Sequence, residues 1–173
     1  MTTPYSTVSK ILHWVLAFLI LALLAFGNKL ANSEPNFETL AQYNQHKLAG
    51  LFAFILILWR LIERLRSGAS FPGGSTPSWE DYLARTVHIL FYAAMIAMPI
   101  TGYAASSAAG QSPVLFGVIL PSIAPQNTAL SDGLFAAHGV IGKVIFGLFI
   151  LHLAGLFKRL IGGDPSVMTR MTG

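Results

Sequence analysis

Four long apolar stretches dominate this sequence and restrict the folds that it can adopt. They cover approximately residues 11–26, 48–65, 87–105 and 134–157. Each is close to the roughly 20 residues that an α-helix needs to cross a bilayer. Their apolar residues are continuous and do not alternate with polar ones, which favours helices over the strands of a membrane barrel. We therefore expect an all-α fold, an integral membrane four-helix bundle in which residues 1–173 form a single domain.

The composition agrees with a membrane protein. Of the 173 residues, 54% are hydrophobic and 10% are charged, whereas ordinary soluble domains carry about 25% charged residues. The chain has no cysteine, which excludes disulfides, iron–sulfur ligation and covalent haem attachment through a Cys-x-x-Cys-His motif. The net charge of +4 does not indicate nucleic-acid binding, because the basic residues are spread over the ends of the apolar stretches.

Lys and Arg are distributed unequally between the polar connections. They are frequent at the middle connection and after the fourth stretch, as Arg60, Arg64, Arg66, Arg85, Lys158, Arg159 and Arg170. The long connection 106–133 contains neither residue type. Because positive charge tends to stay on the cytoplasmic side, we expect both termini and the middle connection to be cytoplasmic.

The middle connection should have two parts. Its first part is rich in Ser, Gly and Pro and predicts a flexible segment. Ser78-Trp79-Glu80-Asp81 then reads as a capped, acidic start of an interfacial helix that leads into the third stretch.

Two histidines of the fourth stretch, His138 and His152, are fourteen residues apart. Fourteen residues are close to four helical turns, so both imidazoles should project from nearly the same face, roughly 21 Å apart along the axis. They would then lie near opposite edges of the hydrocarbon region. One helix could in this way hold a ligand for each of two stacked haems, which points to transmembrane electron transfer.

The other three histidines are placed at matching depths. His46 lies at the outer start of the second stretch, at the level of His138. His13 and His88 lie at the inner starts of the first and third stretches, at the level of His152. Haem iron in electron transfer takes two axial ligands, and neutral imidazole suits it. We expect an outer site of His46 and His138, and an inner site of His152 with either His13 or His88. The alternative is that each histidine only forms hydrogen bonds near an interface.

Three basic residues, one in the outer half of the fourth stretch and two near the inner surface, have two interpretations each. Lys143, five residues after His138, could pair with a haem propionate or attract an anionic donor, or its stem could snorkel to the surface. Arg60 and Arg85 could pair with propionates of the inner haem. Their alternative role is to set the topology and to contact lipid headgroups.

The order and spacing of several motifs resemble the bacterial four-helix cytochrome b561 family over nearly the whole chain. In the first half these motifs are Tyr5-Ser6, His13-Trp14, His46, Gly50 and Trp59-Arg60-Leu61 with Arg64. In the second half they are Leu83-Ala84-Arg85 with His88, Pro99-Ile100-Thr101-Gly102, Phe116-Gly117, Leu120-Pro121, His138, Gly142, Leu151-His152, Asp164 and Arg170-Met171. The sequence departs from the superoxide oxidase branch at Lys158-Arg159, where a histidine associated with quinone is expected.

The resemblance implies a dihaem b-type cytochrome of the bacterial inner membrane, with two b haems per chain and a ubiquinone site. It also implies that four histidines ligate iron: His13, His46, His138 and His152. His88 is then the spare histidine, and its titratable imidazole would suit proton delivery to reduced quinone. We therefore treat His88 and Lys143 as candidate catalytic residues, and Arg60 and Arg85 as further cofactor contacts.

Superoxide oxidases of the family take electrons from superoxide outside and reduce membrane quinone. This makes a superoxide:quinone oxidoreductase the leading expectation, with lipid, quinone and a small anionic donor as partners. The alternative is a non-catalytic haem-bearing anchor that relays electrons for a partner dehydrogenase or hydrogenase. The oligomeric state stays open.

Overall fold

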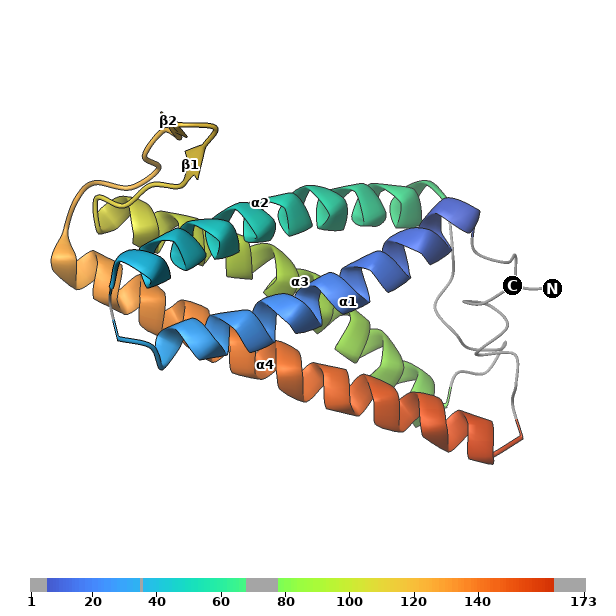
Figure 1. Ribbon diagram of the computed structural model, residues 1–173. Coiled ribbons are helices and arrows are strands. Elements are labelled where there is room, and N and C mark those ends of the chain that lie inside the picture. Colours follow the sequence, from blue (N-terminus) through green and yellow to red (C-terminus); the bar gives the residue numbers. More distant parts are fainter. Residues whose placement is uncertain (1–5, 35, 68–77, 164–173) are drawn as a thin grey trace.

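The computed structural model of the chain describes residues 6–34, 36–67 and 78–163. The expected flexible part of the middle connection, 68–77, and the motif residues Tyr5, Asp164 and Arg170 lie outside the described residues. The elements in chain order are α1 (Thr7–Ala31), α2 (Phe37–Arg66), α3 (Trp79–Ala108), β1 (Val114–Leu115), β2 (Val118–Ile119) and α4 (Thr128–Ile161). The four helices form an elongated bundle (Figure 1), so the expected helical bundle is confirmed.

Each helix begins after a residue whose side chain accepts a hydrogen bond from a backbone N–H of the first turn. These capping residues are Ser6, Asn36, Ser78 and Asn127. Such caps satisfy amide groups that the helix itself leaves unpaired. Ser78 and Asp81 form a reciprocal capping box, which confirms the expected start, and α3 continues from it without a break.

Three of the helices, α1, α3 and α4, are long and apolar enough to cross a membrane. α2 is not among them, since its first turns are polar and Arg60, Glu63 and Arg64 follow closely on its apolar part. α2 packs against α1 and α3, and α4 makes most of its close backbone contacts with α3. Side chains therefore have to bridge from α1 and α2 to α4.

Apolar side chains lie on both the inside and the outside of the bundle. The buried cluster joins α1 and α2 through Leu12, Leu16, Leu56 and Ile57. Other large side chains are more than half exposed on the outer faces, among them Phe18, Phe52, Ile89 and Phe146. Exposed apolar surface on long apolar helices suits contact with lipid tails, which are as apolar as these side chains.

The end of the bundle that holds His46, called the outer end, carries a small hairpin that the sequence did not predict. β1 and β2 pair antiparallel, with Leu115 opposite Val118. Asn44 of α2 holds the hairpin twice: its Nδ2 donates to the carbonyl oxygen of Val114, and its Oδ1 accepts from the Val114 amide, both at 2.8 Å. Lys47 Nζ donates to the carbonyl oxygen of Gln111 at 2.7 Å. These hydrogen bonds fix the hairpin and the segment before it to α2, and Figure 1 shows the hairpin at this end of the bundle.

At the opposite, inner end, two ion pairs join the last turn of α4 to the first turn of α3. Lys158 Nζ lies 2.6 Å from Glu80 Oε1, and Arg159 Nη2 lies 2.6 Å from Asp81 Oδ1. Lys158 Nζ also lies 5.0 Å from the centroid of the Trp79 ring. The two basic residues that replace an expected histidine therefore bind the acidic cap of α3.

Candidate functional site

The five histidines form two groups, one near each end of the bundle, and all five side chains are partly buried. At the outer end, the ring centroids of His46 and His138 are 6.3 Å apart, with an interplanar angle of 83°. At the inner end, the centroids of His13 and His152 are also 6.3 Å apart, and those of His88 and His152 are 5.4 Å apart. Both groups include a histidine of α4, so imidazoles provide the bridge from α4 to α1 and α2.

The outer His138 ring is oriented by the backbone of α3. Its Nδ1 lies 2.9 Å from the carbonyl oxygen of Met98, and because a carbonyl only accepts, Nδ1 carries the proton. The Thr101 hydroxyl, which donates to the Ala97 and Met98 carbonyls at 2.9 Å, lies 3.5 Å from the same nitrogen. This leaves Nε2 of His138 as the unprotonated nitrogen that can bind a metal. A backbone carbonyl is a usual partner for the second nitrogen of a metal-bound histidine.

Two glycines give the outer rings their space. A Cβ at Gly102 would lie 2.8 Å from Cε1 of His138, and a Cβ at Gly27 would lie 2.9 Å from Cε1 of His46. Real Cβ atoms do not approach other carbons so closely, so neither position accepts a larger residue unless the ring moves. Gly102 belongs to a family motif, whereas Gly27 was missed, although a glycine close to the end of an apolar helix is a recognisable signal.

The outer pair also has an incomplete polar environment. In the described part of the chain, two buried side-chain polar atoms lack a hydrogen-bond partner, Nδ1 of His46 and Oε1 of Gln42. They belong to side chains one turn apart on α2. A cavity lies beside both rings, and its mostly apolar lining includes Leu24, Gly50, Met98 and Ile145. Because buried polar groups are nearly always paired, the unpaired His46 nitrogen beside an apolar cavity indicates a place where a bound group belongs.

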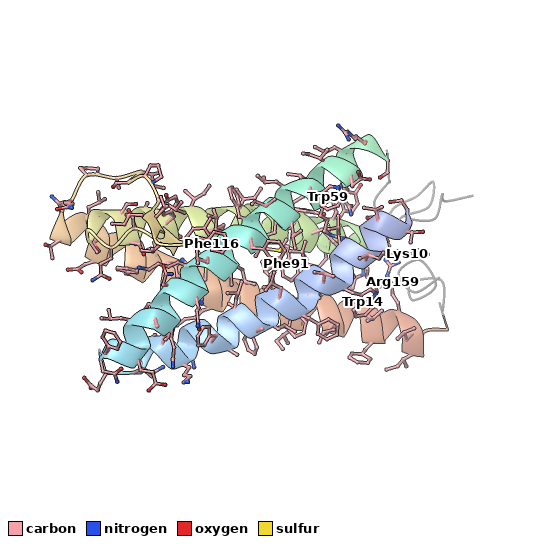
Figure 2. All side chains as sticks on the ribbon, turned by 45° about the horizontal axis from the view of Figure 1, so that its top comes forward. Lys10, Trp14, Trp59, Phe91, Phe116 and Arg159 are labelled. Atoms are coloured by element: carbon pink, nitrogen blue, oxygen red, sulfur yellow. The ribbon has the colours of Figure 1, made fainter. Side chains whose placement is uncertain are left out.

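The inner group is surrounded by aromatic and basic side chains. The centroid of Phe91, which Figure 2 shows between the helices, lies 5.9 Å from that of His152, and Trp14 lies 5.4 Å from His13. His88 Nδ1 donates to the Ala84 carbonyl oxygen at 2.6 Å. The buried Arg60 of α2 donates from Nη1 to the Ser9 carbonyl oxygen of α1 at 2.6 Å. A positive charge is therefore fixed within the bundle at this end.

Two of the remaining sequence candidates lie at exposed positions of their helices. Lys143 is exposed on α4, and the five residues that separate it from His138 turn the helix by roughly 140°. Arg85 is exposed near the start of α3. Arg60, by contrast, is buried, and its hydrogen bond to the Ser9 carbonyl places its guanidinium one turn from His13 on α1.

Comparison with known proteins decides the family. The sequence pattern of the prokaryotic cytochrome b561 family matches residues 4–173. This chain belongs to that family. It is therefore a bacterial membrane cytochrome of the b type, and its family implies a noncovalently bound b-type haem.

Similar proteins span nearly the same length. Probable superoxide oxidase CybB of Yersinia pestis is 28% identical over 174 residues, which cover 99% of this chain and 97% of that protein. Cytochrome b561 homolog 1 of Escherichia coli (strain K12) is 24% identical over 170 residues, 96% of each chain. Cytochrome b561 homolog 2 of the same organism is 25% identical over 185 residues, 98% of this chain and 91% of that protein.

The spacing of the histidine rings can be compared with haem ligation. A metal that bonds one nitrogen of each of two opposed imidazoles, at about 2.0 Å as in other metal–imidazole bonds, holds the ring centroids roughly 6 to 6.5 Å apart. The two pairs that span 6.3 Å, His46–His138 and His13–His152, meet this requirement. His88 and His152, at 5.4 Å, are too close. The residues present thus fit two bis-histidine sites.

We expect Gly102→Ala to disturb the outer site. The added methyl group would overlap the His138 ring, and overpacking of this kind costs roughly 1–3 kcal/mol when the surroundings cannot move. The measurement is haem content and the reduced absorption spectrum of the purified protein. Gly139→Ala is the matched control, because it adds the same group next to His138 on α4 at a position where no atom of another helix lies within 4 Å. Equal spectra for the two variants would contradict the tight fit.

Proposed function

We propose that residues 1–173 form a single dihaem cytochrome unit that transfers electrons across the membrane, from an outer donor to ubiquinone at the inner side. The observation that carries this proposal is the occurrence of two histidine pairs with the same 6.3 Å separation, one at each end of the bundle. Haem, when bound, supplies one-electron redox chemistry. The chain supplies the axial ligands, their orientation and the local charge.

At the outer site, His46 and His138 are the proposed axial ligands. The hydrogen bond from His138 Nδ1 to the Met98 carbonyl fixes the ring and makes the opposite nitrogen more basic. Gly27 and Gly102 let the two rings lie close to α1 and α3. A protein that holds both ligands in place before binding loses less entropy on binding the cofactor.

At the inner site, His13 and His152 are the proposed axial ligands, and Arg60 is the proposed charged neighbour. A buried positive charge stabilises a reduced centre relative to an oxidised one, because reduction adds a negative charge. Arg60 would therefore favour the arrival of electrons at the inner site. Its guanidinium can also pair with a propionate carboxylate, a role that we propose for the exposed Arg85 as well.

His88 is the proposed contact for the quinone headgroup. Its Nδ1 donates to the Ala84 carbonyl, so Nε2 is the nitrogen that can accept a hydrogen bond from a quinol hydroxyl. The ring lies next to His152, close to the inner ends of α3 and α4. A headgroup bound there would lie near the inner site and within reach of protons from the aqueous side.

Superoxide is the proposed outer donor, because a relative of nearly equal length is named a probable superoxide oxidase. Lys143 is exposed, and its long stem can carry the ammonium group towards the outer surface, where it is proposed to attract this anion electrostatically. At the inner end, Lys158 and Arg159 pair with Glu80 and Asp81 and take no part in this scheme beyond joining the helices. A relay that serves a partner dehydrogenase is the competing function.

The first prediction from this scheme concerns haem content. A pyridine haemochrome assay should give about two haems per chain, all extractable by acid acetone because the chain has no cysteine. His46→Ala and His138→Ala should each lower the content to about one and remove the same spectroscopic species, since each variant removes one ligand of a shared iron. A content near one for the unmodified protein, or different species lost by the two variants, would exclude the pairing.

The second prediction separates the inner histidines. His13→Ala should abolish the inner low-spin haem signal in electron paramagnetic resonance, because His13 has the separation from His152 that ligation requires. His88→Ala should keep both low-spin signals and slow the reoxidation of haem by a quinone analogue at least tenfold. Loss of a low-spin signal in His88→Ala, with none in His13→Ala, would reverse the assignment.

Stopped-flow mixing with superoxide tests the proposed donor. Haem in the oxidised, lipid-embedded protein should be reduced by superoxide, and added superoxide dismutase should abolish the effect. Lys143→Gln should slow this reaction severalfold and reduce its dependence on ionic strength, while Lys29→Gln, a basic residue at the end of α1, serves as the control. Reduction by dithionite without reduction by superoxide would favour the relay function.

A further inference from the structure

In the turn of the outer hairpin, one position has a backbone conformation that is unfavourable for the residue found there. β1 and β2 are joined by two residues, Phe116 and Gly117, whose φ angles are 50° and 82°. Two-residue turns with positive φ at both positions are typically Asn-Gly or Asp-Gly. Among the described residues other than glycine, Phe116 alone has a positive φ. A bulky side chain is strained in this region, so a different property must account for phenylalanine here.

Packing within the chain does not account for it. The Phe116 side chain is 97% exposed, and the neighbouring Val118 and Ile119 are 65% and 70% exposed. Figure 2 shows Phe116 on the outer connection, away from the end that holds Arg159. Residues 106–131 include no charged residue. The hairpin therefore presents an uncharged apolar surface.

This surface is held in place from the helices. Asn44 binds Val114 through two hydrogen bonds, and the Tyr103 hydroxyl of α3 donates to the Pro121 carbonyl oxygen at 2.6 Å. Within the connection, the Leu120 amide donates to the Pro113 carbonyl oxygen at 2.9 Å. The hairpin consequently has a defined height along the bundle.

That height corresponds to the edge of the hydrocarbon region. Asn44 lies two residues, or roughly 3 Å, further out than His46, and the two histidine levels marked on α4 by His138 and His152 are roughly 21 Å apart. A hydrocarbon core about 30 Å thick, centred between those levels, extends 4 to 5 Å beyond each of them. The attachment point of the hairpin thus lies within a few ångströms of this edge.

We propose that the hairpin rests on the membrane and inserts Phe116, with Val118 and Ile119, into the lipid leaflet at the outer end of the bundle. Apolar side chains at this depth bind the boundary between headgroups and acyl chains, where aromatic rings are favoured. The connection then contacts lipid instead of extending into water. The inference rests on the proposed placement of the helices across the membrane, with His138 and His152 near its two edges, and does not require that these histidines ligate haem.

The experiment uses the absence of native cysteine, so one introduced thiol can be labelled selectively. Val118→Cys, labelled with a nitroxide in nanodiscs of phosphatidylcholine and phosphatidylglycerol, leaves Phe116 in place. Asp132→Cys is the control, because Asp132 is exposed and six residues, or roughly 9 Å, further out than His138. Collision rates with oxygen, which concentrates in lipid, and with a water-soluble nickel chelate report the depth of each label.

The label at position 118 should collide preferentially with oxygen, and the label at 132 preferentially with the nickel chelate. Adding Phe116→Asn to Val118→Cys should shift position 118 towards the chelate, while the α-helical circular dichroism stays unchanged because asparagine suits the turn. The proposal is wrong if position 118 matches position 132 in the single-cysteine proteins. It is equally wrong if the label is shielded from both reagents, which would indicate a protein partner or second copy on this surface.

Hydrogen–deuterium exchange of the hairpin amides gives an independent test of the lipid contact. If Phe116 contacts lipid, Phe116→Asn should accelerate exchange of the hairpin amides at least threefold in nanodiscs, because that contact is lost. If Phe116 does not contact lipid, Phe116→Asn should only relieve backbone strain and slow the exchange of the hairpin amides. Slower exchange would overturn the proposal. Exchange in α3 near Ala105, which is fully buried, provides the internal reference for both proteins.

Discussion

Contact between imidazoles across the bundle is the interaction on which the rest of this structure depends. Most of the close backbone contacts of α4 are with α3. The histidine pairs bridge the distance from α4 to α1 and α2. Lipid gives apolar helices little reason to associate with one another. The association of α4 with the first two helices therefore relies on polar groups and, in a family of b-type cytochromes, on a cofactor that imidazoles can ligate.

The two ends of the bundle solve different physical problems. At the outer end, small residues beside His46 and His138 create room for the rings, and a backbone carbonyl sets the orientation of one of them. At the inner end, charge predominates: Arg60 is buried against α1, and the ion pairs of Lys158 and Arg159 join α4 to the cap of α3. The inner group thus has a buried positive charge beside it and ion pairs beyond it at the helix ends, whereas the outer one lies beside a mostly apolar cavity.

Much of the fold could be predicted from the sequence, because apolar periodicity and capping are local properties. The apolar stretches predicted the four helices, and the capping pattern predicted the start of α3 at Ser78. The matching depths of the histidines needed only the helical rise. The choice between His13 and His88 required distances across the bundle, and spacing along one chain cannot supply them. The hairpin was missed because its strands are only two residues long. The ion pairs of Lys158 and Arg159 were missed because their partners lie 78 residues away.

α4 contributes one histidine to each of the two groups, and this shared origin has a mechanical consequence. A helix hardly stretches along its axis, since its backbone hydrogen bonds fix the rise per residue. Bending or breathing of the bundle can therefore alter each ring-to-ring contact while the spacing between the outer and inner levels stays nearly constant. A rotation of α4 about its axis, by contrast, displaces His138 and His152 together, so disturbances of this helix are correlated between the ends, whereas those of α1 or α2 stay at one end.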